Sequence, residues 1–390
     1  MKYYLIAGEA SGDLHGSLLM LSLAARDREA RFRFWGGEKM ATACGLDTAH
    51  AEDGDGSNTG AARSTMVHNY RDTAVMGFVE VLTKAGMLRR NLAFCKDDIL
   101  AYAPDALILI DYPGFNLKIA RFAHTHGMKV FYYIAPKVWA SRERRIEQLK
   151  RYVDRLFVIF PFEVEWFRSR GIEPVYEGNP LADHIDALLD SVPPREEFLK
   201  QNGLDSRPLI ALLPGSRMQE IKHLAPRFKK VADTMPGYQF AVAAAPEISP
   251  EVYARYLPGI PVIHGQTYTL LRHSAAAAVA SGTASLEAAV IGTPQVVCYV
   301  MNPLTWRIAI SLLRVRYISL ANLILDKLIF KELLQEKCTP GAIAAELERL
   351  VTDTAARTAM QQDYAAVRTR LGKPGSADRY AEDIQKSLPQ

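Results

Sequence analysis

Near its beginning the chain reads Tyr3-Tyr4-Leu5-Ile6-Ala7-Gly8-Glu9-Ala10-Ser11-Gly12-Asp13-Leu14-His15-Gly16, and a helical pattern follows from about Ser17. The apolar residues at its start predict a buried strand, and the small and polar residues after them predict a turn into the helix. In parallel α/β sheets this turn is where a dinucleotide commonly binds. The loop is neither G-x-G-x-x-G nor G-x-x-x-x-G-K, however, and the carboxylates of Glu9 and Asp13 would repel a pyrophosphate. We therefore expect Glu9, Ser11 and Asp13 to line a cleft and to face sugar hydroxyls; capping of the helix by Ser11 or Asp13 is the structural alternative.

Short strand patterns alternate with longer helical patterns along the chain. Before residue 180 the predicted strands are Tyr3–Ala7, Arg31–Trp35, Ala106–Ile110, Lys129–Ile134 and Arg155–Phe160. After a polar segment at 190–208 they are Leu209–Leu213, Gln239–Ala243, Pro261–His264, Ala276–Ala280 and Gln295–Val300. Such alternation is typical of parallel sheets covered by helices. We therefore expect an α/β fold with two Rossmann-like domains, 1–187 and 188–359, that face each other across a cleft, and a helical C-terminus whose residues from about 360 to 390 pack back on the first domain.

Composition limits the classes of function. Of the 390 residues, 49% are apolar and 23% are charged, which is the usual balance of a packed globular protein, and the length suggests two domains. The net charge of +4 is slight, and no basic stripe is interleaved with aromatic residues. Binding to nucleic acid is therefore not expected.

The sequence predicts neither a metal site nor a cofactor. The nine histidines have no metal-ligand spacing, and the four cysteines are scattered, which fits a reducing cytoplasm. The acidic segment Glu52–Gly60 lacks the ligand order and the bidentate glutamate of a calcium loop, so we expect a solvated loop. The chain enters its first strand without the apolar core of a signal peptide, and every apolar run is well short of the roughly 20 residues that cross a bilayer. Any membrane contact is expected to be peripheral.

Two strand-to-helix turns in the second half have the residue types that bind phosphate. Leu212-Leu213-Pro214-Gly215-Ser216-Arg217 combines glycine, backbone N–H groups and a guanidinium at the start of a helix that contains Glu220. Ala280-Ser281-Gly282-Thr283-Ala284-Ser285-Leu286-Glu287 places small residues in a first helical turn and a carboxylate one turn further on, where it can accept from ribose hydroxyls. Each turn alone is common in α/β folds, but the pair predicts a nucleoside diphosphate site. The predicted contacts are Gly215, Ser216, Arg217, Ser281, Gly282, Thr283 and Glu287.

The candidate catalytic base is Asp111, which follows the apolar strand Ala106–Ile110. Burial at the rim of a cleft can raise the pKa of a carboxyl towards that of a useful base, which could accept a proton from an attacking hydroxyl. An Asx turn before Pro113 is the structural alternative. The other residues expected to line the cleft are Asn116, Trp139 and Asn179. For Trp139, packing in the core is the alternative.

Two stretches, Met76–Leu92 and Asn302–Arg316, combine large apolar residues with basic ones. An interfacial helix uses this combination against anionic lipid, whereas an ordinary amphipathic core helix is the alternative for each stretch. The residues expected to face the membrane are Val79, Leu82, Met87, Leu88, Arg89, Arg90, Trp306 and Arg307.

Several long motifs, in this order, resemble the lipid-A-disaccharide synthase family over nearly the whole chain. They are Ala7–Asp13, Met76–Leu82, Asp111–Asn116, Leu212–Arg217, Ser281–Glu287, Ser319–Leu323 and Lys331–Gln335.

The resemblance implies an inverting glycosyltransferase of the GT-B fold. The implied reaction moves 2,3-diacylglucosamine from its UDP conjugate to the 6-hydroxyl of 2,3-diacylglucosamine 1-phosphate (lipid X), giving a β-1′,6-linked disaccharide 1-phosphate and UDP without a metal. Asp111 matches the family's proposed base, Asn322 joins the UDP-binding residues, and Met76 and Gly77 join the acceptor cleft. The resemblance also implies a cytoplasmic enzyme held peripherally by anionic lipids of the inner membrane, and an exchange of C-terminal regions in a homodimer.

Two other functions are compatible with the same loops. An enzyme similar to UDP-GlcNAc 2-epimerase would need further catalytic carboxylates and a histidine, and would have no use for a lipid-facing surface. A non-catalytic protein that binds a nucleotide sugar or a lipid would bind its ligand without releasing UDP.

Overall fold

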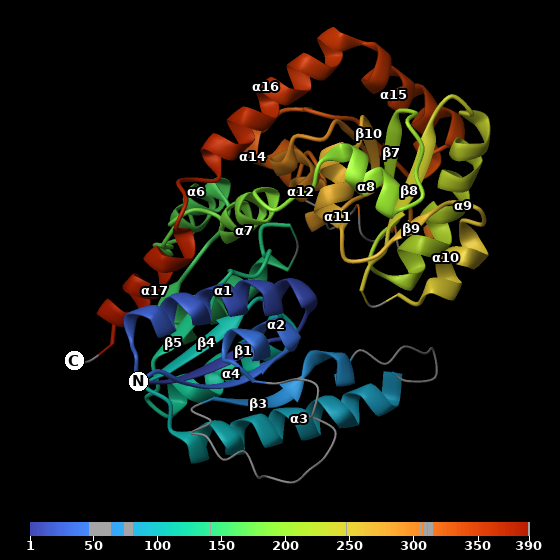
Figure 1. Ribbon diagram of the computed structural model, residues 1–390. Coiled ribbons are helices and arrows are strands. Elements are labelled where there is room, and N and C mark those ends of the chain that lie inside the picture. Colours follow the sequence, from blue (N-terminus) through green and yellow to red (C-terminus); the bar gives the residue numbers. More distant parts are fainter. Residues whose placement is uncertain are drawn as a thin grey trace. The chain divides into compact units, whose positions relative to one another are not determined.

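The computed structural model describes residues 1–46, 64–73, 81–140, 142–246, 248–303, 306–307, 310 and 315–388; at 72–73 and 81–85 it describes the backbone only. These residues form two compact units, Met1–Pro180 with Lys373–Gln390, and Leu181–Gly372 (Figure 1). The boundary expected at residue 187 falls inside helix α7 (Pro180–Leu189), and the one expected near 360 falls inside α16 (Thr354–Arg370). The chain passes from one unit to the other after Pro180 and again after Gly372.

The first unit is built on one six-stranded parallel sheet. Its strands, in spatial order, are β3 (Thr65–Asn69), β2 (Arg31–Gly36), β1 (Lys2–Ala7), β4 (Ala106–Ile110), β5 (Val130–Tyr133) and β6 (Arg155–Leu156). The order is that of a Rossmann fold, and its direction of winding reverses between β1 and β4. The helices are α1 (Ala10–Arg26), α2 (Glu38–Ala43), α3 (Val81–Tyr102), α4 (Pro113–Thr125), α5 (Ile146–Tyr152), α6 (Pro161–Arg168) and α17 (Ser376–Lys386).

The second unit repeats this topology. Its strands, in spatial order, are β12 (Glu332–Leu334), β11 (Gln295–Tyr299), β10 (Ala276–Ala280), β7 (Leu209–Leu213), β8 (Gln239–Ala243) and β9 (Val262–Ile263), so the winding reverses between β7 and β10. The helices from Leu181 on are the rest of α7, α8 (Arg195–Gln201), α9 (Met218–Thr234), α10 (Pro250–Tyr256), α11 (Thr267–His273), α12 (Thr283–Ile291), α14 (Leu320–Leu325), α15 (Pro340–Thr352) and α16.

Every strand predicted from the sequence is present, and the predicted α/β class with two Rossmann-like units is confirmed. The structure adds two strands that the sequence did not reveal, β3 and β12. Both lie at a sheet edge, and β12 has only three residues. Edge strands need only one partner and little apolar surface, so their sequences carry a weak period.

Helix α1 begins at Ala10 and not near Ser17 as its glycines suggested. A Cβ on Gly12 would lie 3.2 Å from the Ala7 Cβ, and one on Gly16 would lie 2.7 Å from the Met40 Sδ. Glycine is therefore needed at these two positions inside the helix, because α1 packs too closely on β1 and α2 to leave room for a side chain. Tertiary packing overrides the low helix propensity of glycine here.

The C-terminal helix α17 completes the first unit and lies along α1 (Figure 1). The Tyr380 hydroxyl is buried, accepts from the Glu177 amide at 3.0 Å, and lies 2.6 Å from the Val158 carbonyl oxygen. Arg155 at the end of the sheet pairs with Asp383 at 2.6 Å. None of the helices in the described ranges is long and apolar enough to span a bilayer.

Candidate active site

The loops after β1 and β4 lie side by side at the point where the first sheet reverses its winding. Ala7 at the end of β1 pairs with Ile110 at the end of β4, so Glu9 and Asp111 follow neighbouring strand ends. Ligands of open α/β sheets bind at this point. Glu9 and Ser11 are exposed and Asp111 is half-buried. The structure therefore brings Glu9 and Asp111, which the sequence singled out separately, to one site.

The backbone at Asp111 is strained and is held by two side chains. Asp111 has φ 42° and Tyr112 has φ 45°, both in the left-handed region that disfavours residues other than glycine. The Asp111 carbonyl oxygen accepts a hydrogen bond from the Tyr132 hydroxyl at 2.7 Å and from Asn116 Nδ2 at 2.9 Å. Strain that is held in place in this way is characteristic of functional sites. Asn116 is fully buried, so it holds the turn that carries the base and is not exposed to a ligand.

The environment of the Asp111 carboxyl suits a general base. Its pKa is raised above the usual aspartate value, chiefly because the group is buried. The negative charge of Glu9 raises the pKa further, whereas the positive charge of Lys137 and a hydrogen bond with the Tyr112 backbone lower it. A carboxylate with a raised pKa is a stronger proton acceptor. Lys137 was not singled out from the sequence, and it reaches the site from the loop after β5.

Asp13 has a structural role, because its carboxylate binds backbone amides of a neighbouring helix. Its carboxylate is buried and accepts from the backbone amides of Gly37 at 2.7 Å, Lys39 at 3.1 Å and Met40 at 3.1 Å. It therefore caps α2 from a neighbouring helix. The sequence anticipated a capping role only for the helix that carries Asp13, because the neighbour at 38–43 is close in space and distant along the chain.

Trp139 and Asn179 are also buried. The Trp139 Nε1–H donates to Glu163 at 2.8 Å, and Asn179 Nδ2 donates to the Ile159 carbonyl at 3.1 Å. The Glu163 carboxylate also accepts from the backbone amides of Ile159 and Phe160, and burial raises its pKa to about 7. The Trp139 contact fixes the loop that carries Lys137, and the Asn179 contact holds the segment after β6.

The loops after β7 and β10 meet at the corresponding point of the second sheet, because Leu213 pairs with Val279. Gly215 has φ 114°, and a Cβ there would lie 2.4 Å from a carboxylate oxygen of Glu220. That carboxylate accepts from the amides of Ser216 at 3.1 Å and Arg217 at 3.3 Å. The amides expected to hold a phosphate are thus capped by Glu220, whereas 69% of the Arg217 side chain is exposed. Arg217 is the group of this loop that can reach an anion.

The second loop carries Ser281, Gly282 and Thr283 into α12. Gly282 is exposed, and Ser281 and Thr283 are half-exposed, so this first helical turn is accessible to a ligand. Glu287, one turn inside, accepts a hydrogen bond from the Tyr268 hydroxyl of α11 at 3.1 Å. Tyr268 orients this carboxylate, and no sequence motif pointed to it.

Asn322 is fully buried. Its Oδ1 accepts from the Ile329 amide at 2.9 Å, and its Nδ2 donates to Glu332 at 2.9 Å. Its amide is engaged within the protein, so Asn322 holds the turn between α14 and β12 and is not placed as a direct nucleotide contact.

Comparisons with known proteins identify the family of this chain. Residues 55–385 match the family described as lipid-A-disaccharide synthetase. The lipid-A-disaccharide synthase of Trichlorobacter lovleyi is 36% identical over 396 residues, which cover 99% of this chain and 97% of the relative. The enzyme of Myxococcus xanthus is 35% identical over 397 residues, covering 100% and 98%. This chain belongs to the lipid-A-disaccharide synthase family. It is a glycosyltransferase of lipid A biosynthesis, as the motifs predicted.

Solved structures confirm the GT-B fold that is expected for this family. The UDP-GlcNAc 2-epimerase of Methanocaldococcus jannaschii, in complex with UDP-GlcNAc and UDP, has a TM-score of 0.64 at 12% identity and covers 99% of this chain and 100% of its own. The calicheamicin glycosyltransferase CalG4 has a TM-score of 0.54 at 16% identity, covering 98% and 97%. At these identities the likeness concerns the fold alone.

The residues of the first unit that are expected to face a membrane fall into three groups. Val79 and the side chain of Leu82 lie outside the described residues, as do Met76 and Gly77, which were expected in the acceptor cleft. Met87 and Leu88 line a cavity in the first unit, which corrects their expected outward position. Arg89 and Arg90 are exposed on α3 and do not line the cavity.

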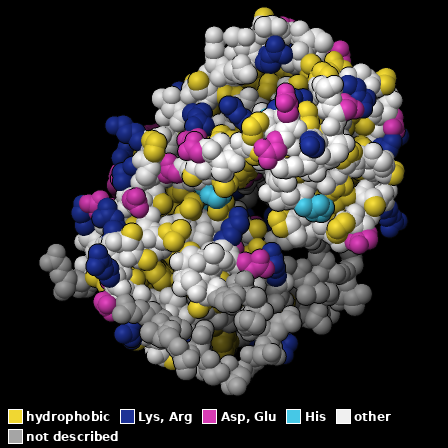
Figure 2. Space-filling view, viewed as in Figure 1, with side chains coloured by type: hydrophobic (Ala, Val, Ile, Leu, Met, Phe, Trp, Pro, Cys, Tyr) yellow, Lys and Arg dark blue, Asp and Glu magenta, His cyan; other side chains and the backbone are white. Residues whose placement is uncertain are grey.

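In the second unit, Trp306 is half-buried beside Tyr299, with ring centroids 6.1 Å apart, and Arg307 is exposed. On the face shown in Figure 2, acidic and basic side chains are interspersed, as the small net charge suggests. Within the part of the chain that the structure describes, no group of three or more histidine, cysteine, aspartate or glutamate side chains is placed to hold a metal ion.

Proposed function

We propose that this enzyme transfers 2,3-diacylglucosamine from its UDP conjugate to the 6-hydroxyl of 2,3-diacylglucosamine 1-phosphate. Asp111 takes the hydroxyl proton while the oxygen attacks the anomeric carbon. The bond from that carbon to the β-phosphate oxygen breaks, UDP leaves with the electron pair, and the anomeric configuration inverts. The position of Asp111 carries the proposal, because a strained, locked carboxylate with a raised pKa lies where the sheet reverses its winding.

The second unit supplies the donor site in this proposal. The exposed Arg217 guanidinium neutralises the diphosphate, and the amides of the first turn of α12 approach it beside Gly282. Glu287, oriented by Tyr268, accepts from the ribose hydroxyls. These groups stabilise the negative charge that develops on departing UDP, so we propose that no metal is required.

The acceptor half of the proposal is tested with Asp111→Asn. The variant should bind UDP with unchanged affinity and form disaccharide at least about 1,000-fold more slowly, because proton removal by a positioned base commonly contributes 100- to 10,000-fold. Asp97→Asn, at an exposed position on α3, is the matched control. Product is measured by mass spectrometry, and turnover of the Asp111→Asn enzyme at the normal rate would remove Asp111 from the role of base.

The donor half is tested with Arg217→Ala. Loss of a charge-assisted contact should weaken UDP binding by about 10- to 100-fold in calorimetry. Arg255→Ala, at an exposed position on α10, is the control. The same assays in EDTA test independence from metals: disaccharide formation should continue at an unchanged rate, and its loss would contradict that part of the proposal.

We propose further that the enzyme works peripherally on an anionic membrane surface, on the cytoplasmic side of the inner membrane. Arg89 and Arg90 are exposed on α3, and 53% of Phe94 is exposed one turn after Arg90. Basic groups beside an exposed aromatic ring suit an anionic lipid interface. The four free cysteines fit a reducing compartment. Arg89→Glu with Arg90→Glu should abolish flotation with vesicles that contain phosphatidylglycerol, and retained flotation would refute this surface.

A further inference from the structure

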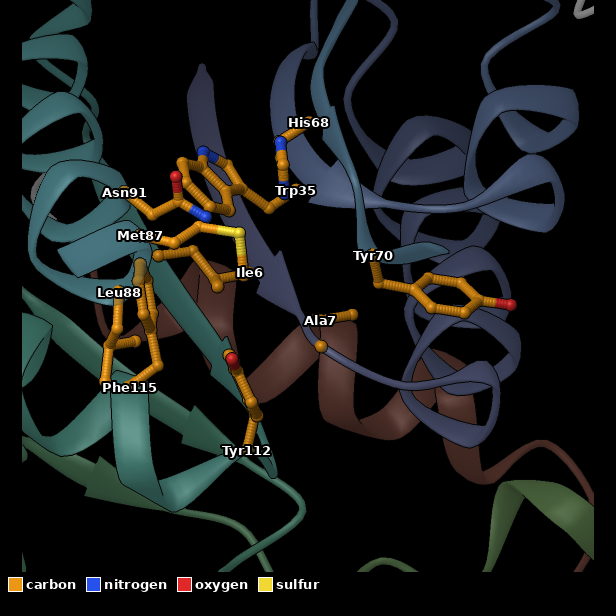
Figure 3. Close-up of a pocket in the computed structure, with 11 residues that line it drawn as sticks. Ile6, Ala7, Trp35, His68, Tyr70, Met87, Leu88, Asn91, Tyr112 and Phe115 are labelled. Atoms are coloured by element: carbon orange, nitrogen blue, oxygen red, sulfur yellow. The ribbon is translucent and has the colours of Figure 1, made fainter. Parts of the chain in front are cut away.

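A cavity of about 200 Å³ lies beside the candidate base in the first unit (Figure 3). Its walls come from the ends of β1, β2 and β3, from the first turn of α4, and from one face of α3. Figure 3 shows Trp35 on one side and Tyr112 on the opposite side, with Ile6 and Ala7 between them. The cavity therefore opens beside the residue that follows Asp111.

The aromatic wall is held rigidly. The Trp35 Nε1–H donates to the Tyr4 hydroxyl at 3.0 Å, and that hydroxyl donates to Asp98 at 2.7 Å. Arg33 pairs with Asp98. The rings of Trp35 and Phe115 have centroids 5.3 Å apart. A wall fixed by a chain of hydrogen bonds keeps its shape, so the cavity is preformed.

The opposite wall is formed by Tyr112, the residue that follows the candidate base Asp111 in the chain. The Tyr112 ring stacks on Phe115 with centroids 5.5 Å apart and covers the bare backbone of Gly8, where a Cβ would lie 2.4 Å from ring carbons. Tyr112 is also the second residue of the strained turn that begins at Asp111. Whatever occupies the cavity thus contacts the residue next to the base.

The chemistry of the walls defines the occupant. The described residues that line the cavity include no aspartate, glutamate, lysine or arginine, and most are aliphatic or aromatic; the polar exceptions include His68 and Asn91. A phosphate or a nucleotide would lose its hydration here without a charged partner. An apolar protein cavity of about 150 Å³ holds one benzene molecule, so this cavity suits a hydrocarbon segment of roughly eight carbons.

We propose that this cavity binds the first carbons of a hydrocarbon chain of the acceptor lipid. The assignment rests on the proposed function, because the acceptor is the substrate whose hydroxyl must reach Asp111. Met87 and Leu88, which lie on α3, then help to select the length of the acyl chain. The size of the cavity sets the length beyond which further methylenes add nothing to transition-state binding.

The test measures kcat/KM for acceptors whose acyl chains run from acetyl to tetradecanoyl, with one donor held constant. In the unaltered enzyme kcat/KM should rise roughly fourfold for each buried methylene and level off near octanoyl. Leu88→Trp removes room for roughly two methylenes, so the octanoyl-to-acetyl ratio should fall on the order of 10-fold. Leu88→Ala enlarges the cavity and should move the plateau to longer chains.

Leu100→Trp is the matched control, because Leu100 lies on the same helix with 44% of its surface exposed and does not line the cavity. The readout is a ratio within one variant, so a partial loss of folded protein does not alter it. An unchanged ratio in Leu88→Trp, or a change confined to a reciprocal donor series, would overturn the assignment while leaving the transferase activity intact. Absence of transfer to every acceptor by the unaltered enzyme would instead overturn the proposed function.

Discussion

Removal of both donors to the Asp111 carbonyl should release the strained turn and displace the base. The perturbations are Tyr132→Phe and Asn116→Leu, singly and together. Both side chains are buried, and they donate to the same carbonyl oxygen at 2.7 Å and 2.9 Å. Tyr132→Phe removes one hydroxyl, and Asn116→Leu keeps the branched shape of the side chain while it removes the amide.

The magnitudes follow from the geometry. Each residue other than glycine in the left-handed region costs about 1–2 kcal/mol, so the turn at Asp111 and Tyr112 stores about 2–4 kcal/mol. One hydrogen bond contributes about 0.5–1.5 kcal/mol net, so Tyr132→Phe should cost about 1 kcal/mol. Asn116→Leu should cost about 2–3 kcal/mol, because its Nδ2 also lies 3.2 Å from the Ile110 carbonyl oxygen and that group loses a buried partner.

In the double variant, the loss of stability should be smaller than additive and the loss of kcat should be larger than additive. Once both donors are gone, the turn relaxes and its strain is released. The loss in the free energy of unfolding of the double variant should therefore be smaller than the sum of the two single losses by about 1–2 kcal/mol. For the same reason kcat should fall by more than the product of the single effects, because the carboxylate moves away from the acceptor.

The assay combines urea unfolding, followed by circular dichroism, with kcat for disaccharide formation. Tyr3→Phe serves as the control, since Tyr3 is a fully buried tyrosine of the same sheet whose hydroxyl bonds to Met1. Strictly additive losses in both quantities would refute the view that these two donors jointly hold a strained base.

Two further predictions concern charge and backbone at the two sites. Catalysis requires Asp111 without its proton, so kcat/KM should fall as the pH drops through its raised pKa. Lys137→Met should move this acidic limb of the pH–rate profile to higher pH, because the positive charge of Lys137 lowers the pKa of Asp111. Glu9→Gln should move it to lower pH, because the negative charge of Glu9 raises that pKa. Parallel shifts in pH–rate profiles would contradict this. Gly215→Ala should weaken UDP binding and cost about 1–2 kcal/mol of stability, because φ is 114° and its Cβ would meet the Glu220 carboxylate; unchanged calorimetry and unfolding curves would contradict the close approach.

Much of the site could be predicted because its residues follow strand ends. Asp111 and the segment Ser281–Thr283 come directly after an apolar run, and Arg217 lies in the short turn after another. In a parallel sheet such positions lie at the ligand-binding edge. Periodicity and turn residues are local signals, so the loops could be found one at a time. The motifs that resembled the family then supplied the reaction.

The roles of Asp13, Asn116 and Asn322 could not be predicted in the same way. Each is a polar residue in a motif beside a strand or helix end, and the structure shows each one buried and bonded to backbone groups. A sequence shows that a polar side chain is present but not whether its partner is a ligand or a neighbouring amide. The hydrogen-bond partner decides that, and in Asp13 it belongs to another helix.

The sequence by itself determined the class of fold, the reaction family and the loops that carry the chemistry, because apolar periods and motifs are written along the chain. Only the tertiary structure decided that β1 adjoins β4 and that β7 adjoins β10, which brings Glu9 to Asp111 and Arg217 to the start of α12. It alone turned Met87 and Leu88 towards a cavity beside Tyr112. Strand order and helix facing depend on contacts between residues that are distant along the chain, and no local period records them.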